Sequence, residues 1–342
     1  MANKRLRLKD DELEIIQEFR RIKDESIKQG IPIEDVKHGW IKSDRSSLFF
    51  KNPKFKDQTT QQFEKLKESL ISQFKDYAPN YPTQKRTKSK DGHLLVISPT
   101  DIHIGKLCSS FETGEDYNQQ IAVKRVKDGV NGILQESSGW DIEKILLIIG
   151  NDILHTDTPS KTTKGTLQET DGNWYDNFLT GVRLYVDLIN QLKAVAPVHV
   201  IHAPSNHDYQ SSFYIAQLIE AHFNQCKEVT FDCSIAHRKY FSWHDNLISA
   251  THGDGAKTAD LPMLMAHESK DWTKCKHRYI YTGHLHHKVS KDYMSVCIET
   301  TRSPSGTDSW HHIKGYQHAP KAIEGFIHHK KQGQKARLVH LF

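Results

Sequence analysis

The sequence predicts an α/β protein: a four-layer αββα sandwich domain preceded by a small, mostly helical N-terminal module. From residue 93 onward, apolar runs of strand length alternate with stretches of helical periodicity, which is typical of βαβ units. Toward the C-terminus, strands follow one another with few helices between them, which indicates a second sheet. Residues 1–92 hold 21 Lys and Arg against 15 Asp and Glu, a net charge of +6, whereas the remainder is close to neutral.

The composition sets the broad class of protein. The 342 residues allow about two domains, and 37% hydrophobic with 26% charged residues is typical of a soluble globular chain. No apolar run reaches the ~18 residues of a membrane-spanning helix, and the charged N-terminus lacks the apolar core of a signal peptide. Five cysteines without a C-x-x-C pair predict neither a disulfide framework nor a zinc ribbon. We therefore expect a cytoplasmic protein without a membrane partner.

Residues 1–75 are predicted to form the basic, mostly helical N-terminal module. Apolar residues recur at helical spacing in two places, and Gly30-Ile31-Pro32 ends the first of these helices. The expected elements are, in order, a helix over 10–29, a short helix over 32–38, a strand over 47–50 and a helix over 61–74. This order fits a winged helix-turn-helix, although many small modules share it.

Residues 76–92 are predicted to be a basic linker. They contain Pro79, Asn80 and Pro82, which favour turns, and a run of Lys and Arg between residues 85 and 90. A basic segment beside a near-neutral domain suggests an arm for a polyanion such as DNA. A solvated helical surface explains the same charge equally well.

Residues 93–342 are predicted to form the sandwich domain. The expected strands cover 94–98, 145–149, 198–202, 229–232, 237–242, 247–252, 278–282, 293–299, 323–328 and 337–341. The expected helices cover 117–137, 174–194, 213–224 and 259–269. Helices between the early strands predict parallel pairing there, and the strand-rich second half predicts an antiparallel return sheet.

Side chains that bind metal ions follow five of the predicted strands. In open α/β sheets the carboxyl ends of the strands are where ligands bind. A single D-x-H or H-x-H is uninformative, but five such strand ends in order predict a metal site. The seven candidate ligands are Asp101, His103, Asp152, Asn206, His252, His284 and His286, and His207 and Asp208 follow Asn206 directly.

The types of side chain indicate which ions would bind. Carboxylate, imidazole and amide oxygen together suit Mn²⁺, Fe²⁺ or Zn²⁺, and Mg²⁺ remains an alternative. No cysteine joins the series, which disfavours a structural zinc site. Seven candidate ligands exceed the needs of one tetrahedral ion and fit two divalent ions that share a carboxylate.

The series resembles the calcineurin-like metallophosphoesterase superfamily, whose motifs run D-x-H, G-D, G-N-H-D/E, H and G-H-x-H. The resemblance covers about 94–289 and implies two divalent ions, with Mn²⁺ preferred. It implies that one ion is bound by Asp101, His103, Asp152 and His286, and the other by Asp152, Asn206, His252 and His284. It also implies that His207 faces the scissile phosphate as a catalytic residue and that Asp208 orients it.

Two positions depart from these motifs. Ser205 stands where the family has the first glycine of G-N-H-D, and Asn151 stands where many members have a second glycine. The stretch from Gly150 to His155 resembles the G-G-D-L-F-H motif of DNA-repair exonuclease subunits, which include phage-encoded members. That likeness implies a nuclease, and a host-cytoplasm location if the chain is phage-encoded.

Three further residues are candidate substrate contacts, each with a structural alternative. His155 follows the G-N-D motif, and Arg302 and Trp310 lie in an irregular segment where they would pair with a phosphate and stack on a base. Packing within the domain explains Trp310 as well. The polar segment 156–173 is long enough to form a rim or lid. The remaining histidines considered are not expected to be ligands: His287, His311, His312, His318, His328 and His329.

The function expected from these observations is hydrolysis of phosphodiester bonds by an exonuclease-like DNA nuclease. One alternative is a phosphomonoesterase or nucleotide phosphodiesterase for small substrates. The non-enzymatic alternative is a metal-stabilised binding scaffold, although a scaffold has no need of His207 and Asp208. DNA is the expected partner, and a homo-oligomer or a partner protein is left open.

Overall fold

The computed structural model describes residues 20–28, 30–32, 36–42, 47–51 and 91–342. The chain divides into two units, residues 1–69 and 70–342. None of the helices in the described ranges has the length and apolar character that crossing a membrane requires.

The first unit contains a helix over residues 20–28 and a two-stranded hairpin of β1 (His38–Lys42) and β2 (Ser47–Lys51). The predicted strand over 47–50 is confirmed as β2. The predicted short helix over 32–38 is wrong in its described part, because residues 36 and 37 are not helical and His38 begins β1. Residues 38–42 pair with residues 47–51 instead, and the contact of Trp40 with Phe49 across the two strands favours a hairpin over a helix. The helix over 61–74 and the linker up to residue 90 lie outside the described residues.

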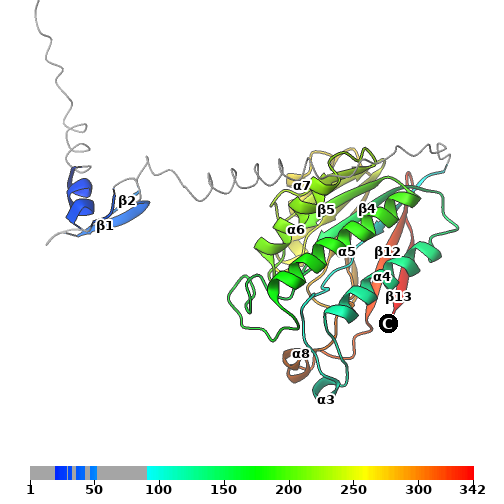
Figure 1. Ribbon diagram of the computed structural model, residues 1–342. Coiled ribbons are helices and arrows are strands. Elements are labelled where there is room, and N and C mark those ends of the chain that lie inside the picture. The colour runs from blue at the N-terminus through cyan, green and yellow to red at the C-terminus, as the bar shows by residue number, and fades with distance from the viewer. Residues whose placement is uncertain (1–19, 29, 33–35, 43–46, 52–90) are drawn as a thin grey trace, which may run out of the picture. The chain divides into compact units, whose positions relative to one another are not determined.

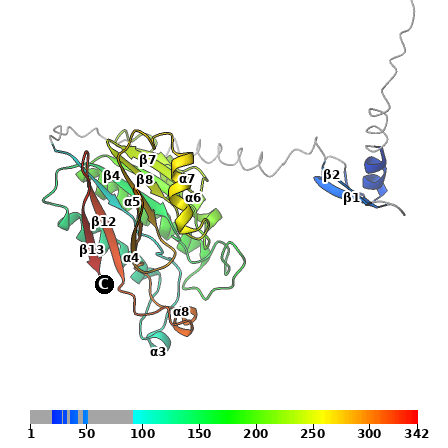
Figure 2. The same ribbon diagram turned by 180° about the vertical axis from the view of Figure 1, so that it is seen from behind.

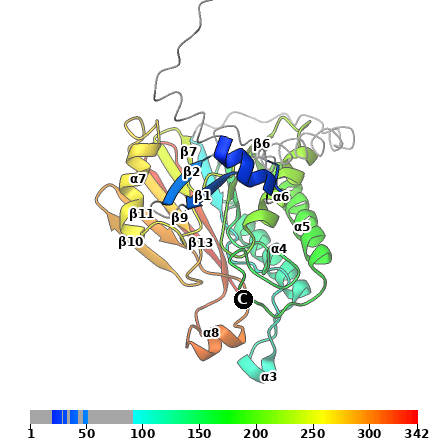
Figure 3. The ribbon, with the colours of Figure 1, turned by 90° about the vertical axis from the view of Figure 1, so that its left-hand side faces the viewer.

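The second unit has four layers, as the sequence predicts (Figure 3). One sheet has the strand order β13-β12-β3-β4-β5-β6, and the other has the order β10-β11-β9-β8-β7. The first sheet comprises β3 (His93–Ile97), β4 (Ile142–Gly150), β5 (Val198–Ala203), β6 (Val229–Asp232), β12 (Ala322–His329) and β13 (Gly333–Leu341). The second comprises β7 (Lys239–Trp243), β8 (Asn246–Ala250), β9 (His277–Thr282), β10 (Val289–Tyr293) and β11 (Val296–Thr300).

Helices form the two outer layers. Three of them cover the six-stranded sheet (Figure 1): α4 (Gln119–Glu136), α5 (Trp174–Val195) and α6 (Tyr209–His222). The outer face of the five-stranded sheet carries α7 (Leu261–Glu268), which follows the short 3₁₀ helix η2 (Thr258–Asp260) (Figure 2). Alternation along β3 shows why the sheets stack: Leu95 and Ile97 pack toward the helices, whereas Leu94 and Val96 pack toward the other sheet.

The strand pairing confirms one expectation and corrects another. Strands β3 to β6 pair in parallel, as predicted. The second sheet is mixed rather than antiparallel, because β8, β9 and β11 are parallel and only β7 and β10 run against their neighbours. The crossover through α7 returns the chain in the same direction, which makes β8 and β9 parallel. The last two strands join the first sheet, where β12 lies antiparallel beside β3.

Candidate metal centre

The carboxyl ends of β3, β4, β5, β8 and β9 bring the predicted ligands to one edge of the two sheets. Four of these side chains are almost inaccessible to solvent: Asp101, His103, Asp152 and His252 are 0%, 2%, 1% and 1% exposed. Polar groups of this kind are buried only where they are paired or bind something. The convergence that the strand-end pattern predicts is therefore present in the fold.

One group of possible ligands is formed by Asp101, His103 and His286. The Nε2 atom of His286 lies 3.4 Å from Oδ1 of Asp101 and 3.3 Å from Nε2 of His103. Burial, together with the charges of His207 and Lys106, holds the pKa of His103 well below its usual range. Burial also lowers the pKa of His286 to about 4. Both rings are therefore neutral near pH 7, and a neutral imidazole is the form that binds a cation.

A second group is formed by Asp101, Asp152 and His252. The Nε2 atom of His252 lies 3.2 Å from Oδ2 of Asp152 and 2.9 Å from Oδ1 of Asn206. The buried Nδ1 atom of His252 finds no hydrogen-bond partner in the described part of the chain. Asp152 is also 3.9 Å from Nε2 of His103, so it lies between the two groups. The donor set and its orphaned nitrogen fit divalent cations, and the buried clusters are consistent with a dinuclear site.

The remaining predicted ligand, His284, lies at the edge of the second group. Its ring makes an edge contact with the His252 ring, with centroids 5.0 Å apart. Its backbone N–H donates to both carboxylate oxygens of Asp101, at 3.1 and 2.9 Å. His284 therefore fixes the orientation of Asp101 in addition to presenting its own imidazole.

The backbone of the centre is strained. Six residues have φ between 51° and 69°, the left-handed region that costs an L-residue roughly 1–2 kcal/mol: Asp101, His103, Asn151, Asp152, His284 and His286. Gly150 has φ 86°, and a Cβ there would lie 2.1 Å from the carbonyl oxygen of Ala203. Such strain persists only where the surrounding fold holds it, and it concentrates at functional sites.

His207 is oriented by a different group from the one predicted. Its Nδ1 atom lies 2.9 Å from the backbone carbonyl oxygen of His155, and its backbone N–H donates to Oδ1 of Asp152 at 3.0 Å. The carboxylate of Asp208 instead accepts hydrogen bonds from Ser205 Oγ and from the backbone N–H of Leu154, each at 2.7 Å. The prediction that Asp208 orients His207 is therefore wrong, because the turn between them directs the carboxylate into the core.

Ser205, the departure from the glycine motif, has a structural role that sequence reasoning missed. Its Oγ accepts the backbone N–H of Asp152 at 2.7 Å and donates to Asp208. Burial raises the pKa of Asp208, and the negative charge of Asp152 is a second, smaller cause. The serine thus links the loop after β4 to the start of α6, where a glycine would leave both neighbours without this hydroxyl.

The three predicted substrate contacts lie in different surroundings. His155 is 3% exposed and its ring stacks on His207, with centroids 5.4 Å apart. The guanidinium of Arg302 forms an ion pair with the buried Glu324, so its charge is engaged inside the fold rather than presented at the centre. Trp310 lies on the short helix α8 (Ser309–Ile313) and is 55% exposed.

Segment 156–173 borders His207. The backbone N–H of Thr163 donates to the carbonyl oxygen of His207 at 3.2 Å. The carboxylate of Asp157 accepts from the Thr163 hydroxyl at 2.9 Å and from the backbone N–H of Ser211 at 2.7 Å. These contacts attach the segment to the start of α6, which makes it a rim of the centre.

Sequence reasoning also missed a group beside the centre that is built on a buried lysine: Lys106, Asp308 and His311. Lys106 is 1% exposed, and its amine lies 2.9 Å from Asp308. A lysine after a D-x-H motif carries no sequence signal of burial, because its partner Asp308 lies about 200 positions further along the chain.

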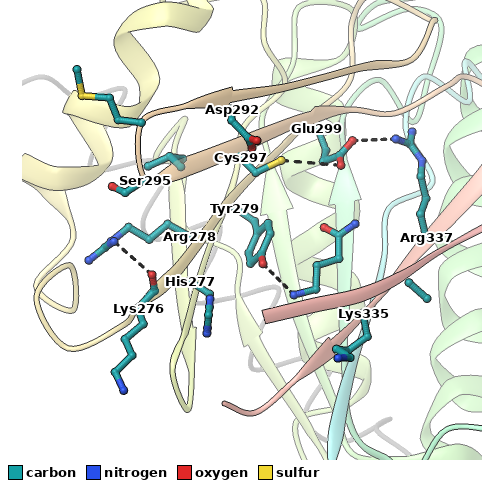
Figure 4. A pocket seen from close by; sticks show the side chains of 14 residues that line it. Lys276, His277, Arg278, Tyr279, Asp292, Ser295, Cys297, Glu299, Lys335 and Arg337 are labelled. Carbon is teal, nitrogen blue, oxygen red and sulfur yellow. Dashed lines mark hydrogen bonds and ion pairs between the residues drawn. The ribbon is translucent and has the colours of Figure 1, made fainter. Parts of the chain in front are cut away.

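A separate hollow of about 510 Å³ lies between β9, β10, β11 and β13 (Figure 4). None of the candidate ligands lines it. Within it, Arg337 is paired with Glu299 at 2.8 Å, and the hydroxyl of Tyr279 accepts the backbone N–H of Gln334 at 2.8 Å. These contacts join β13 to β11 and β9, away from the metal centre.

No protein-family model and no curated protein matches the chain. Solved structures resemble it at low identity. An archaeal phosphodiesterase is 12% identical with a TM-score of 0.36, covering 73% of this chain and 99% of its own. Wild-type Vps29 from Entamoeba histolytica, complexed with Zn²⁺, is 11% identical with a TM-score of 0.30, covering 73% and 98%. A predicted phosphoesterase from Streptococcus pneumoniae is 13% identical with a TM-score of 0.30, covering 73% and 97%.

Proposed function

We propose that the chain is a metal-dependent phosphoesterase of the calcineurin-like type that cleaves phosphodiester bonds. The observation that carries this proposal is the buried convergence of carboxylates and imidazoles beside the half-buried His207. In the proposed assignment Asp101, His103 and His286 hold one ion, Asn206, His252 and His284 hold the other, and Asp152 is shared. When bound, the two ions would supply Lewis acidity to the phosphoryl group and lower the pKa of water, and Mn²⁺ suits the ligands.

His207 is the proposed general acid. A carbonyl oxygen only accepts hydrogen bonds, so the contact with His155 assigns a proton to Nδ1 of His207 and directs Nε2 away from that carbonyl. In the imidazolium form, Nε2–H is then available to protonate the leaving oxygen. The backbone hydrogen bond from His207 to Asp152 keeps this ring at a fixed distance from the proposed shared ligand.

We further propose that the substrate is DNA and that the enzyme is exonuclease-like. Two sequence features support this: the basic residues 1–92 and the resemblance of Gly150–His155 to nuclease subunits. The proposed organisation is a DNA-binding module at 1–75, a basic linker at 76–92 and a catalytic domain at 93–342. The exposed ring of Trp310 would then be a place for a base to stack.

One set of assays tests the proposal. The full chain with Mn²⁺ is incubated with labelled single- and double-stranded DNA, with bis(p-nitrophenyl) phosphate and with p-nitrophenyl phosphate. We expect cleavage of DNA and of the small diester. Hydrolysis of the monoester alone would favour a phosphomonoesterase, and metal-dependent stability without any turnover would favour a scaffold.

A further inference from the structure

A buried lysine lies beside the metal centre. Lys106 follows β3, three residues after His103, and is 1% exposed. Its amine lies 2.9 Å from Oδ2 of Asp308. An uncompensated buried charge costs several kcal/mol, so removing Asp308 alone would destabilise the fold. Asp308 is thereby fixed at the end of a segment that is otherwise irregular.

Asp308 in turn fixes His311 at two points. Its Oδ1 accepts the backbone N–H of His311 at 2.8 Å and lies 2.6 Å from Nδ1 of the ring. Burial alone would raise the pKa of Asp308, but the hydrogen bond from His311 and the charge of Lys106 outweigh burial and hold this pKa far below its usual range. An ionised carboxylate only accepts, so Nδ1 carries the proton and the ring has one orientation.

The ring of His311 lies flat against the ring of His286. Their centroids are 5.0 Å apart, with 21° between the planes. His286 is the side chain that faces Asp101 and His103 in the first group of ligands. A continuous series of contacts therefore leads from Lys106 to a candidate ligand.

Helix α8 lies at the surface of the second unit. None of its residues is buried, and the element beside it is the equally short α3 (Ser110–Thr113) (Figures 1 and 3). A five-residue helix that buries no apolar side chain depends on other contacts, such as polar ones, for its position. The Lys106–Asp308 pair is a contact of this kind.

We propose that Lys106, Asp308 and His311 are positioning residues for one of the two ions. The Lys106–Asp308 pair fixes His311, and His311 holds the imidazole of His286 so that its Nε2 faces Asp101 and His103. This inference rests on the metal-binding part of the proposed function. Removing an outer partner of a metal-ligating histidine typically weakens metal affinity about 10–100-fold.

Calorimetric titration of the metal-free full chain with Mn²⁺ tests His311. We expect His311→Ala to weaken one of two binding events about 10–100-fold and to leave the other unchanged. His311→Phe keeps a ring against His286 and is expected to recover most of the affinity. His312→Ala is the matched control, because His312 lies on the same helix, is exposed and contacts Gln317. Wild-type affinity for both ions in His311→Ala would overturn the proposal.

The buried pair needs a different variant. Replacing Asp308 alone would leave Lys106 charged and unpaired in the interior. Both side chains are therefore changed together in Lys106→Met/Asp308→Ala, which also removes the Oδ1 atom that accepts from His311. This double variant is expected to reproduce the weakened binding event of His311→Ala. Wild-type Mn²⁺ binding by the double variant would mean that Lys106 and Asp308 do not position His286. If the wild-type chain shows both binding events but does not cleave DNA, only the nuclease function is overturned. If the wild-type chain binds no Mn²⁺, both the proposed function and this inference are overturned.

Discussion

Asp152 is attached to its surroundings through both backbone and side chain. Its N–H donates to Ser205, its Oδ1 accepts from the backbone of His207, and its Oδ2 lies 3.2 Å from Nε2 of His252. These partners come from the loops after β5 and β8, so one aspartate sets the separation of three strand ends. A carboxylate with neighbours on both sides suits the shared ligand of the proposed two-ion site.

Replacing His207 tests the proposed acid. His207→Ala is expected to lower kcat on DNA by about 10²–10⁴, the usual contribution of general acid catalysis, and to leave Mn²⁺ binding unchanged. His237→Ala is the control, because His237 stacks on Tyr209 outside the groups of ligands. Turnover rates and calorimetric titration provide the two readouts. Unchanged turnover in a correctly folded His207→Ala would remove the acid role.

Asn151 is a residue whose replacement should stabilise the fold. It has φ 52°, is 1% exposed, and both polar atoms of its side chain lack hydrogen-bond partners among the described residues. Glycine adopts this backbone without steric cost and removes the two unpaired atoms. We expect Asn151→Gly to raise the free energy of unfolding by about 1 kcal/mol, measured by urea denaturation without metal.

The control for this change is Asn224→Gly. Asn224 is exposed, and its φ is not positive, so glycine has no strain to relieve there. A lower free energy of unfolding in Asn151→Gly would mean that the Asn151 amide makes a favourable contact in solution.

At the level of residues, the sequence predicts positions better than contacts. The ligands follow strands, and any parallel sheet gathers such residues at one edge, so Asp101 and Asp152 were identifiable. The carbonyl of His155 as the partner of His207 was not, because backbone atoms carry no sequence signal. The Lys106–Asp308 pair joins distant segments and required the folded chain.

Among the secondary-structure elements, the loop between β5 and α6 depends on one hydroxyl. Ser205→Ala removes the acceptor for the Asp152 N–H and a donor to Asp208, and both neighbours are buried. Leaving such groups unpaired costs about 1–3 kcal/mol. We expect thermal denaturation to show this loss for Ser205→Ala and none for Ser138→Ala, whose side chain is exposed. Equal melting temperatures would mean that water replaces the hydroxyl.

The element boundaries show where sequence patterns are informative. The buried strand β3 was predicted to within one residue, because the apolar run over 94–97 defines it. Strand β10 was missed because Ser290, Lys291 and Asp292 are polar and exposed at a sheet edge. Helices α3 and α8 were missed because four or five residues are too few to show a helical period.

Over the whole molecule, buried histidines should make stability depend on pH. The chain has 22 histidines, and burial lowers the pKa of both His202 and His328 to about 3. Their stabilisation is complete above the unfolded pKa of about 6.5 and is lost as pH falls toward the folded pKa. Between pH 6.5 and 5 each should therefore cost about 2 kcal/mol, since one pH unit corresponds to about 1.4 kcal/mol.

Urea denaturation at several pH values measures this loss. His328→Gln should lower the slope of the free energy of unfolding against pH by the equivalent of about one proton. His312→Gln, at an exposed position, should leave the slope unchanged. The same slope in both variants would mean that other groups take up the protons.

The charge of residues 1–92 gives a prediction about DNA. Neutralising Lys85, Arg86, Lys88 and Lys90 to Gln in the full chain should weaken DNA binding and lower the slope of log affinity against log salt by about 3. Fluorescence anisotropy at several KCl concentrations gives the slope. Hydrolysis of bis(p-nitrophenyl) phosphate should be unchanged. An unaltered slope would mean that these four residues do not contact DNA phosphates.

The place of β12 beside β3 has a consequence for synthesis on the ribosome. Strand β3 ends at Ile97, but the neighbour that completes its outer edge ends only at His329. During most of translation, the unpaired N–H and C=O groups of that edge are open to other nascent chains. Truncated chains that end before residue 322 would lack β12, and the edge of their β3 would remain unpaired. The sandwich domain should therefore fold late, after nearly all of it has left the exit tunnel, and should need protection by chaperones until then.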